Sequence, residues 1–189
     1  MADVKQNTDD MGTFTDPRDG QTYKTVKIGS QIWMAENLNY EFVDSCCVDD
    51  DTENNKKYGR LYTWKAAKVA RPDGWHIPSQ EEWDELETFV AETLFRGDKD
   101  FVGYALKAKK GWNDDCYDGG NGSDAVGFGA LSAGFCLKGG ALQQFGDTAY
   151  FWIGSSDRYR SLFYNRMDLG FDYFNSARYM ASVRCVKDS

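Results

Sequence analysis

The chain changes character near Gly111, and this change constrains its fold more than any other feature. Before that point, apolar residues recur at helical spacing. After it, Gly, Asn and Asp are dense as far as Asp124, and short aromatic runs then alternate with polar turns until Val186. We therefore expect an α+β domain, with helices in the first two-thirds and an irregular antiparallel sheet towards the C-terminus, and not a parallel βαβ fold.

The clearest predicted helix begins after Ser79. Ser79 and Glu82 have the S-x-x-E spacing of a capping box, in which each residue satisfies a backbone N–H of the other. The apolar positions that follow recur close to the helical period and predict a buried stripe: Trp83, Leu86, Phe89, Val90 and Leu94. Shorter helices are expected over residues 101–110 and around Leu61, Trp64 and Ala67.

Residues 22–33 mix β-branched and aromatic side chains around Gly29-Ser30, which predicts a hairpin. Residues 44–57 are acidic and amide-rich without periodicity, so we expect an exposed loop there. Its Asp49-Asp50-Asp51 run is a weak calcium candidate, because calcium needs six to eight oxygen ligands that converge from several directions. We otherwise expect no cofactor.

Composition limits the partners. A formal net charge of −8 opposes binding to phosphate backbones and to anionic membrane surfaces. No apolar run approaches the length that spans a bilayer. At 189 residues we expect one domain over residues 14–189 after a flexible acidic tail over residues 1–13. That tail does not resemble a signal peptide, so export would depend on a segment outside this sequence.

The five cysteines are Cys46, Cys47, Cys116, Cys136 and Cys185. They form no CxxC pair, which disfavours a zinc or thioredoxin-like site. One or two disulfides in an oxidising compartment fit this pattern better, and an odd count leaves at least one thiol unpaired within the chain.

No catalytic constellation is visible in the sequence. The single histidine, His76, lies in an apolar GWHIP run, where a structural role is favoured over catalysis. The chain contains no G-x-S-x-G elbow, P-loop, HExxH or GxGxxG motif. Carboxylates are numerous, but their spacing alone cannot place two of them together as an acid/base pair. We therefore name no catalytic residue and expect a non-enzymatic domain.

Five blocks occur in order along the chain: DGQTYKTVKIGSQIWMAENLNY (19–40), YGRLYTWKAA (58–67), PDGWHIPSQEEWDEL (72–86), GGNGSDAVGFGALSAGF (119–135) and ASVRCVKD (181–188). On these blocks the chain, over residues 14–188, resembles the Fibrobacter succinogenes major paralogous domain, a bacterial surface module. The resemblance implies a C-type-lectin-like fold, similar to that of the formylglycine-generating enzyme, and an extracellular or cell-surface location. Fold alone does not confer the oxidase activity of that enzyme, and its metal-binding cysteine pair has no counterpart in the C-terminal region here. This chain has Arg71 where the family often has a cysteine, so the partner of Cys185 stays open between Cys116 and Cys136.

Residues 155–179 are rich in Tyr, Phe, Arg, Asp, Asn and Ser, which are the residue types of antibody paratopes. Rigid aromatic side chains supply contact area at low entropic cost, and Arg supplies forked donors. Because alternate side chains of a strand face one side, we expect Phe151, Ile153, Leu162, Met167 and Leu169 to point inward. The predicted ligand-contacting residues are Asp157, Tyr159, Arg160, Tyr164, Asn165, Arg166, Asp168, Asp172, Tyr173, Asn175, Arg178 and Tyr179.

The same window contains no Lys, Glu, Gln or Trp. Several proteins with the fold that the resemblance implies are diversified by retroelements that mutate adenines, a process that does not produce these four residue types. Apart from Met167, residues 155–179 contain only residue types that this process can produce, so diversification by a retroelement is a hypothesis for this chain. The function expected is binding or adhesion to a protein or glycan ligand, on a cell surface or a phage tail. The alternative is a structural subunit of a surface fibre or outer-membrane assembly.

Overall fold

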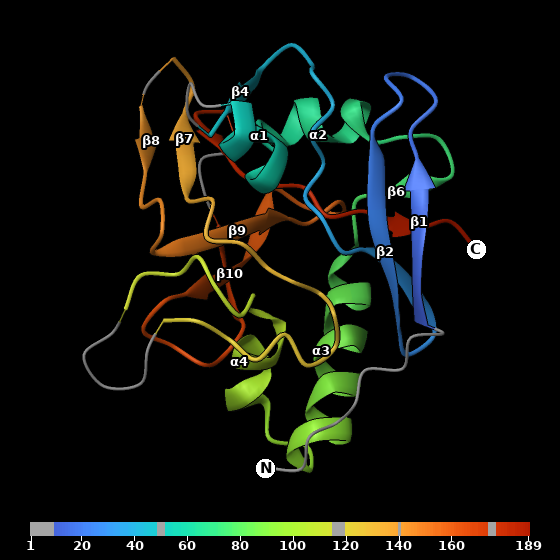
Figure 1. Ribbon diagram of the computed structural model, residues 1–189, viewed down its shortest axis with the longest axis vertical. Helices are drawn as coiled ribbons and strands as arrows, with labels where there is room; N and C mark the ends of the chain where they lie inside the picture. The colour runs from blue at the N-terminus through green and yellow to red at the C-terminus, as the bar shows by residue number, and fades with distance from the viewer. Residues whose placement is uncertain (1–9, 49–51, 115–119, 140, 174–176) are drawn as a thin grey trace.

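The computed structural model describes residues 10–48, 52–114, 120–139, 141–173 and 177–189. It is a mixed α+β structure in which α1 and α2 lie at one end and α3 and α4 at the other, with β9 and β10 between them (Figure 1). The predicted α+β class is confirmed. None of the described helices is long and apolar enough to cross a bilayer.

The largest sheet joins both ends of the chain. It is antiparallel, with the order β1-β2-β3-β13-β6. Its strands are β1 (Met11–Thr15), β2 (Thr22–Ile28), β3 (Gln31–Met34), β13 (Val186–Lys187) and β6 (Trp75–His76). Strands therefore also occur early, and the expected segregation of helices and strands along the sequence is only partly right. The reason is that the C-terminal β13 completes a sheet begun by the N-terminal hairpin, with Val186 opposite Trp33.

The predicted hairpin is confirmed as β2 and β3. They pair from Thr25 opposite Met34 to Ile28 opposite Gln31, and Gly29 has a positive φ of 61° in the turn. The predicted N-terminal tail is too long, because Met11 already belongs to β1.

The capped helix is confirmed as α3 (Gln80–Phe95). Ser79 Oγ accepts a hydrogen bond from the Glu82 backbone N–H at 3.2 Å, and Glu82 Oε2 accepts one from the Ser79 N–H at 2.7 Å. Trp83, Leu86 and Val90 are buried. Phe89 was expected in the same stripe but is 38% exposed, because it lies over the turn of the β2–β3 hairpin and not within the core.

Three local predictions need correction. The helix expected over residues 101–110 is the short α4 (Val102–Leu106), preceded by the 3-10 turn η2 (Lys99–Phe101). The helix expected around residue 61 is α2 (Trp64–Ala70), which begins after its N-cap Thr63, so Leu61 belongs to a strand. The segment predicted as a loop contains β4 (Ser45–Cys47) and α1 (Thr52–Tyr58), while the Asp49–Asp51 calcium candidate lies outside the described residues.

Three smaller sheets complete the fold. The first has the order β11-β10-β9, the second β12-β7-β8, and the third pairs β4 with β5. Their remaining strands are β5 (Arg60–Tyr62), β7 (Phe135–Leu137), β8 (Leu142–Gln143), β9 (Thr148–Trp152), β10 (Arg158–Phe163), β11 (Gly170–Tyr173) and β12 (Tyr179–Met180).

The core consists of large aromatic groups on both faces of β9 and β10. On one face Phe151 and Leu162 pack with Trp83 of α3, and Trp83 lies 4.8 Å from Trp33 between ring centroids. On the other face Trp152 and Tyr159 belong to a second cluster with Tyr62, Ala181 and other residues that join this sheet to β5 and β12. The β9–β10 pair is therefore buried on both sides.

A fully buried arginine, Arg184, holds two segments, residues 34–37 and residues 128–129, to this core. Its Nε donates to Asn37 Oδ1 at 2.6 Å, and its Nη2 donates to the Gly129 carbonyl at 3.0 Å. Its Nη1 donates to the Phe128 carbonyl and, at 3.3 Å, to that of Met34. Burial lowers the pKa of Arg184 to about 9, with nearby acidic groups opposing the shift.

No disulfide joins two cysteines within the described part of the chain, where one or two had been expected, and Cys116 lies outside it. Cys185 is buried in the second aromatic cluster. The thiol of Cys46 instead hydrogen-bonds with that of Cys136.

Candidate functional site

The predicted contact residues lie mainly on and beside the β9–β10–β11 sheet. Within each antiparallel pair, opposite residues share a face. One face therefore carries Arg158 opposite Tyr173 and Arg160 opposite Phe171, and the other carries Tyr159 opposite Asp172. Among the described residues, β11 pairs only with β10 and forms the edge of the sheet.

Two of the predicted contact residues are buried, and their expected exposure was wrong. Tyr159 is 6% exposed because it packs edge-to-face on Tyr150, with centroids 5.0 Å apart. Arg160 is 5% exposed because α3 covers it: Arg160 Nη2 lies 2.9 Å from Glu87 Oε2. The prediction assumed a sheet with one open face, whereas β10 is covered on both.

The exposed part of the sheet is its edge strand. Tyr173 is 74% exposed and Phe171 is 38% exposed, and Asp172 between them is also exposed. The Arg158 guanidinium lies 5.0 Å from the centre of the Phe171 ring, a cation–π distance. We call Arg158, Phe171, Asp172 and Tyr173 the β11 edge. The exposed Asp157 precedes Arg158 in sequence and so adjoins this edge.

The loop that leads into β11 is held from beneath by a buried lysine. Lys107 is 2% exposed, and its Nζ donates to the carbonyls of Phe163 at 3.1 Å, Tyr164 at 3.4 Å and Arg166 at 3.0 Å. Burial lowers the pKa of Lys107 to about 8, although the nearby Asp168 carboxylate opposes this shift. Three donors matched to three backbone acceptors fix the path of this loop whatever its side chains are.

A close helix contact holds the same loop. The backbone N–H of Tyr104 donates to the Met167 carbonyl at 2.8 Å, and Gly103 lies so near the Asp168 carbonyl that a Cβ would overlap it. Arg166 and Asp168 form an ion pair at 2.5 Å on the outer side. Asn165 and Arg166 are exposed, and Asp168 is partly buried.

The remaining predicted residues have mixed placements. Tyr164 is half-buried against the core. Arg178 is exposed and Tyr179 is half-buried, but both belong to the β12 side of the molecule, where Tyr179 packs on Phe135 with centroids 5.4 Å apart. Asn175 lies outside the described residues. Of the five expected inward residues, Phe151, Ile153, Leu162 and Leu169 are buried and Met167 is half-buried.

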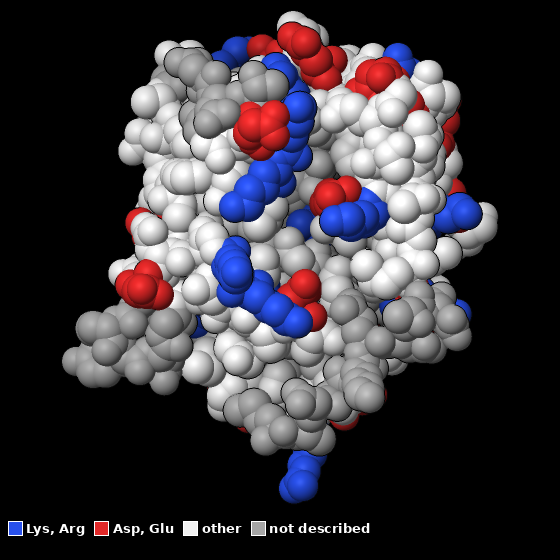
Figure 2. Space-filling view, viewed as in Figure 1, with Lys and Arg blue, Asp and Glu red and all other residues white. Residues whose placement is uncertain are grey.

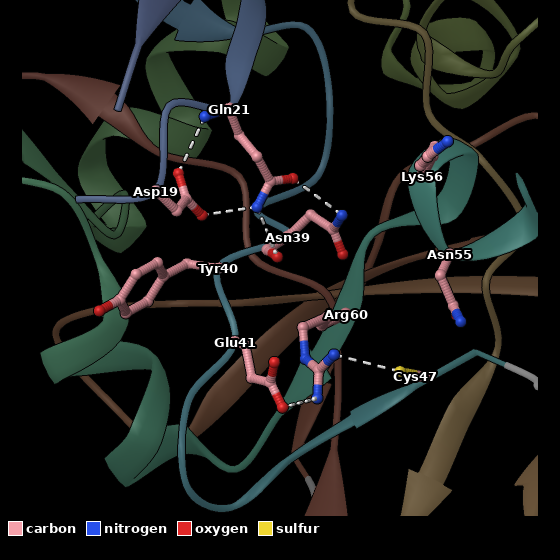
Figure 3. A pocket seen from close by; sticks show the side chains of 9 residues that line it. All are labelled: Asp19, Gln21, Asn39, Tyr40, Glu41, Cys47, Asn55, Lys56 and Arg60. Carbon is pink, nitrogen blue, oxygen red and sulfur yellow. Dashed lines mark hydrogen bonds and ion pairs between the residues drawn. The ribbon is translucent and has the colours of Figure 1, made fainter. Parts of the chain in front are cut away.

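Sequence reasoning missed a polar pocket of about 630 Å³. Figure 3 shows its lining, in which Gln21 Nε2 donates to Asp19 at 2.6 Å and Asn39 Nδ2 donates to Gln21 Oε1 at 2.9 Å. On the opposite wall, Arg60 Nη1 donates to Cys47 Sγ at 3.1 Å. The lining residues of this pocket come from separate segments of the chain, so no local pattern predicted it. The one indication in the sequence was that Gln21, Asn39 and Arg60 lie in the first two of the five blocks that resemble the family. Most of its polar groups are hydrogen-bonded to one another.

His76 is hydrogen-bonded through both ring nitrogens. Its Nδ1 lies 2.7 Å from Asp188 Oδ1 and its Nε2 2.7 Å from Glu82 Oε1, so it links β6 to the start of α3 and to the C-terminal end. Burial opposes its charged form, but the two carboxylates outweigh burial and raise the pKa of His76. Across the described ranges no group of three or more His, Cys, Asp or Glu side chains is placed to hold a metal ion.

Charge is intermixed on the face shown in Figure 2, where Lys and Arg side chains lie among Asp and Glu. Among the described residues of that face, no broad patch of one sign is seen. The site residues on the described part of β11 and the loop before it likewise combine both signs, with Arg158 and Arg166 beside Asp168 and Asp172.

The fold and these surfaces define a mixed α+β domain whose C-terminal half carries an exposed aromatic and charged edge. Comparison with protein families matches residues 26–187 to the Fibrobacter succinogenes major domain, so the chain belongs to that family. No curated protein and no solved structure matches the chain.

Proposed function

We propose that this domain is a non-enzymatic binding module with a C-type-lectin-like fold, which recognises a protein partner outside the cell through the β11 edge and the loop before it. Two observations support the proposal: the chain belongs to the Fibrobacter succinogenes major domain family, and the β11 edge exposes aromatic and charged side chains. A glycan ligand is the less favoured form of the same proposal.

The observation that carries the proposal is the exposure of aromatic side chains on a rigid sheet. Tyr173 is 74% exposed and Phe171 38%, although residues 159–162 of the neighbouring β10 are buried. Exposing a large aromatic side chain to water forfeits its burial energy, which is about 1.5–3 kcal/mol for a phenylalanine. Tyr and Arg are also the residue types enriched at protein-binding hot spots.

Preorganisation supports the same assignment. The three carbonyls bound by Lys107 and the close approach of Gly103 fix the loop that carries Asn165 and Arg166. A loop already held in one conformation loses less entropy when it binds. Such a surface suits recognition by shape and by a few fixed polar contacts.

A binding screen tests the proposal. The purified domain is applied to arrays of surface proteins and glycans, beside a Phe171→Ala/Tyr173→Ala variant. The matched control is Val43→Ala/Phe145→Ala, because Val43 is 75% exposed and Phe145 39% exposed, outside the proposed surface. We expect the β11 variant to lose binding at least tenfold and the control to keep it. Binding that survives in the β11 variant would place the ligand elsewhere.

The structural-subunit alternative makes a different prediction. If the β11 edge joins copies in a fibre, the free domain self-associates as its concentration rises, and the Phe171→Ala/Tyr173→Ala variant does not. Sedimentation velocity over a hundredfold concentration range distinguishes this outcome from binding to a foreign ligand.

Retroelement diversification of residues 155–179 is part of the proposal. Its support is the absence of Lys, Glu, Gln and Trp from that window. Related genes from one source should then differ mainly at the exposed positions of the window. Differences spread evenly along the chain would remove this part of the proposal.

A further inference from the structure

Strand β4 places Cys46 beside Cys136, a residue far away in the sequence. The two thiols are in hydrogen-bonding contact. Cys46 lies opposite Leu61 in the β4–β5 pair, and Cys136 lies opposite Met180 in the β7–β12 pair. A bridge between Tyr62 and Ala181 connects these two small sheets. The contact between the thiols therefore follows from the pairing of four strands.

The pair is enclosed by apolar side chains. Val48, Leu61, Ala133 and Met180 are buried around Cys136, and Cys46 packs against the same cluster. The Arg60 guanidinium lies near Cys46, but it hydrogen-bonds to Ser45 Oγ at 3.0 Å and to Cys47 Sγ at 3.1 Å. A covalent bond between the two sulfur atoms would remove two weakly polar S–H groups from apolar surroundings and would leave no ion without a partner.

The neighbouring cysteines have different surroundings. Successive side chains of a strand point to opposite faces, so Cys47 points away from Cys46. It is exposed, and its sulfur accepts a hydrogen bond from Arg60 at 3.1 Å. Cys185 is buried in the second aromatic cluster with Tyr23 and Trp75, whereas Cys136 belongs to a different cluster.

We propose that Cys46 and Cys136 form a disulfide that fastens β4 to β7. The pairing is independent of the proposed binding function. It also differs from the pairings left open by the sequence, which concerned Cys185. Because Cys47 of the same strand lines the polar pocket, the cross-link would also fix one wall of that pocket.

The reaction requires an oxidant, and a low-molecular-weight disulfide such as oxidised glutathione supplies it. The two thiols lose two protons and two electrons as the new S–S bond forms. The reagent's S–S bond breaks, and its two halves leave as thiols. Burial raises the pKa of the Cys46 thiol, and its hydrogen bond with Cys136 adds to the effect, so the exchange should proceed faster in mildly alkaline solution.

The test uses the full chain. Reduced protein is incubated with a reduced/oxidised glutathione buffer at pH 8, free thiols are blocked with an alkylating reagent, and peptides are mapped without reduction. We expect one internal cross-link, between Cys46 and Cys136, and blocked thiols at the other three cysteines. Since the bond closes a long loop, oxidation should raise Tm by roughly 10 °C.

Matched variants separate the pair from its neighbour. Cys46→Ala should abolish both the cross-link and the oxidation-dependent rise in Tm, whereas Cys47→Ala should retain both. The proposal is overturned if the wild-type map shows Cys46 joined to Cys47, shows Cys136 joined to Cys116 or Cys185, or shows Cys46 and Cys136 still alkylated after prolonged oxidation. Because the wild-type map alone decides among these outcomes, the test does not depend on the variants folding.

Discussion

Arg184→Ala is the substitution with the largest expected cost, because Arg184 connects residues 34–37 to residues 128–129, which are far apart in the sequence. Its guanidinium donates to the side chain of Asn37 and to the carbonyls of Met34, Phe128 and Gly129. It also lies 4.7 Å from the centre of the Phe128 ring. Alanine removes all of these contacts and leaves a cavity beside that ring.

The magnitude follows from the acceptors that lose their donor. Each buried acceptor left unsatisfied costs about 1–3 kcal/mol. The substitution also removes the desolvation cost of the buried guanidinium, which offsets several kcal/mol of the summed cost of the four unsatisfied acceptors. The net loss in the free energy of unfolding should therefore be about 4 kcal/mol, which corresponds to a fall in Tm of roughly 12 °C for a domain of this size.

Urea unfolding followed by tryptophan fluorescence measures this loss. Arg184→Lys keeps a positive charge but not the forked geometry, so we expect an intermediate value. Arg178→Ala is the matched control, since the Arg178 side chain is exposed, and should change stability by less than ~0.5 kcal/mol. A loss for Arg184→Ala no larger than one ordinary hydrogen bond, ~1 kcal/mol, would refute the reasoning.

Three further predictions concern groups near the loop and the C-terminal end. Gly103→Ala should destabilise the domain by about 2 kcal/mol, because its Cβ overlaps the loop backbone, and it should also weaken ligand binding; unchanged urea unfolding would contradict the close approach. Lys107→Met should increase amide hydrogen exchange in residues 163–167, since three carbonyls lose their donor; exchange unchanged from wild type would show that the loop is held without it. Charged His76 stabilises the native state because its native pKa is raised above the ordinary 6.5 by Glu82 and Asp188. That contribution is complete below pH 6.5 and is lost as pH rises through the native pKa, so the stability difference between wild type and His76→Gln should shrink over that range; a difference that grows with pH would refute the assignment.

Local signals in the sequence were sufficient where one segment determines its own structure. The Ser79–Glu82 capping box predicted the start of α3, and Gly29 predicted the turn of the first hairpin. Long-range pairing was not predictable in this way. Nothing near Val186 indicates that it lies opposite Trp33, so the five-stranded sheet could not be derived from the patterns of its separate strands.

The candidate site was predicted in part for the same reason. Alternation along β10 gives two faces, and the sequence of the strand does not show that both are covered. Arg160 is buried by Glu87, which lies in a helix far upstream, and Tyr159 is buried by Tyr150 of the neighbouring strand. Tyr173 remained exposed because β11 is the edge strand, a property of sheet order and not of residue type.

Lys107 and Arg184 suggest how such a surface could vary without loss of the fold. Charged residues are seldom fully buried, so no sequence pattern predicted that either of them lies in the interior. Each donates chiefly to backbone carbonyls, at residues 163, 164 and 166 for Lys107 and at residues 34, 128 and 129 for Arg184. A backbone carbonyl is present whatever the side chain, so substitutions at Asn165 or Arg166 leave the hydrogen bonds of Lys107 in place. A framework that holds loops by their backbone therefore allows the exposed side chains on those loops to change, which is the property that a variable binding surface requires.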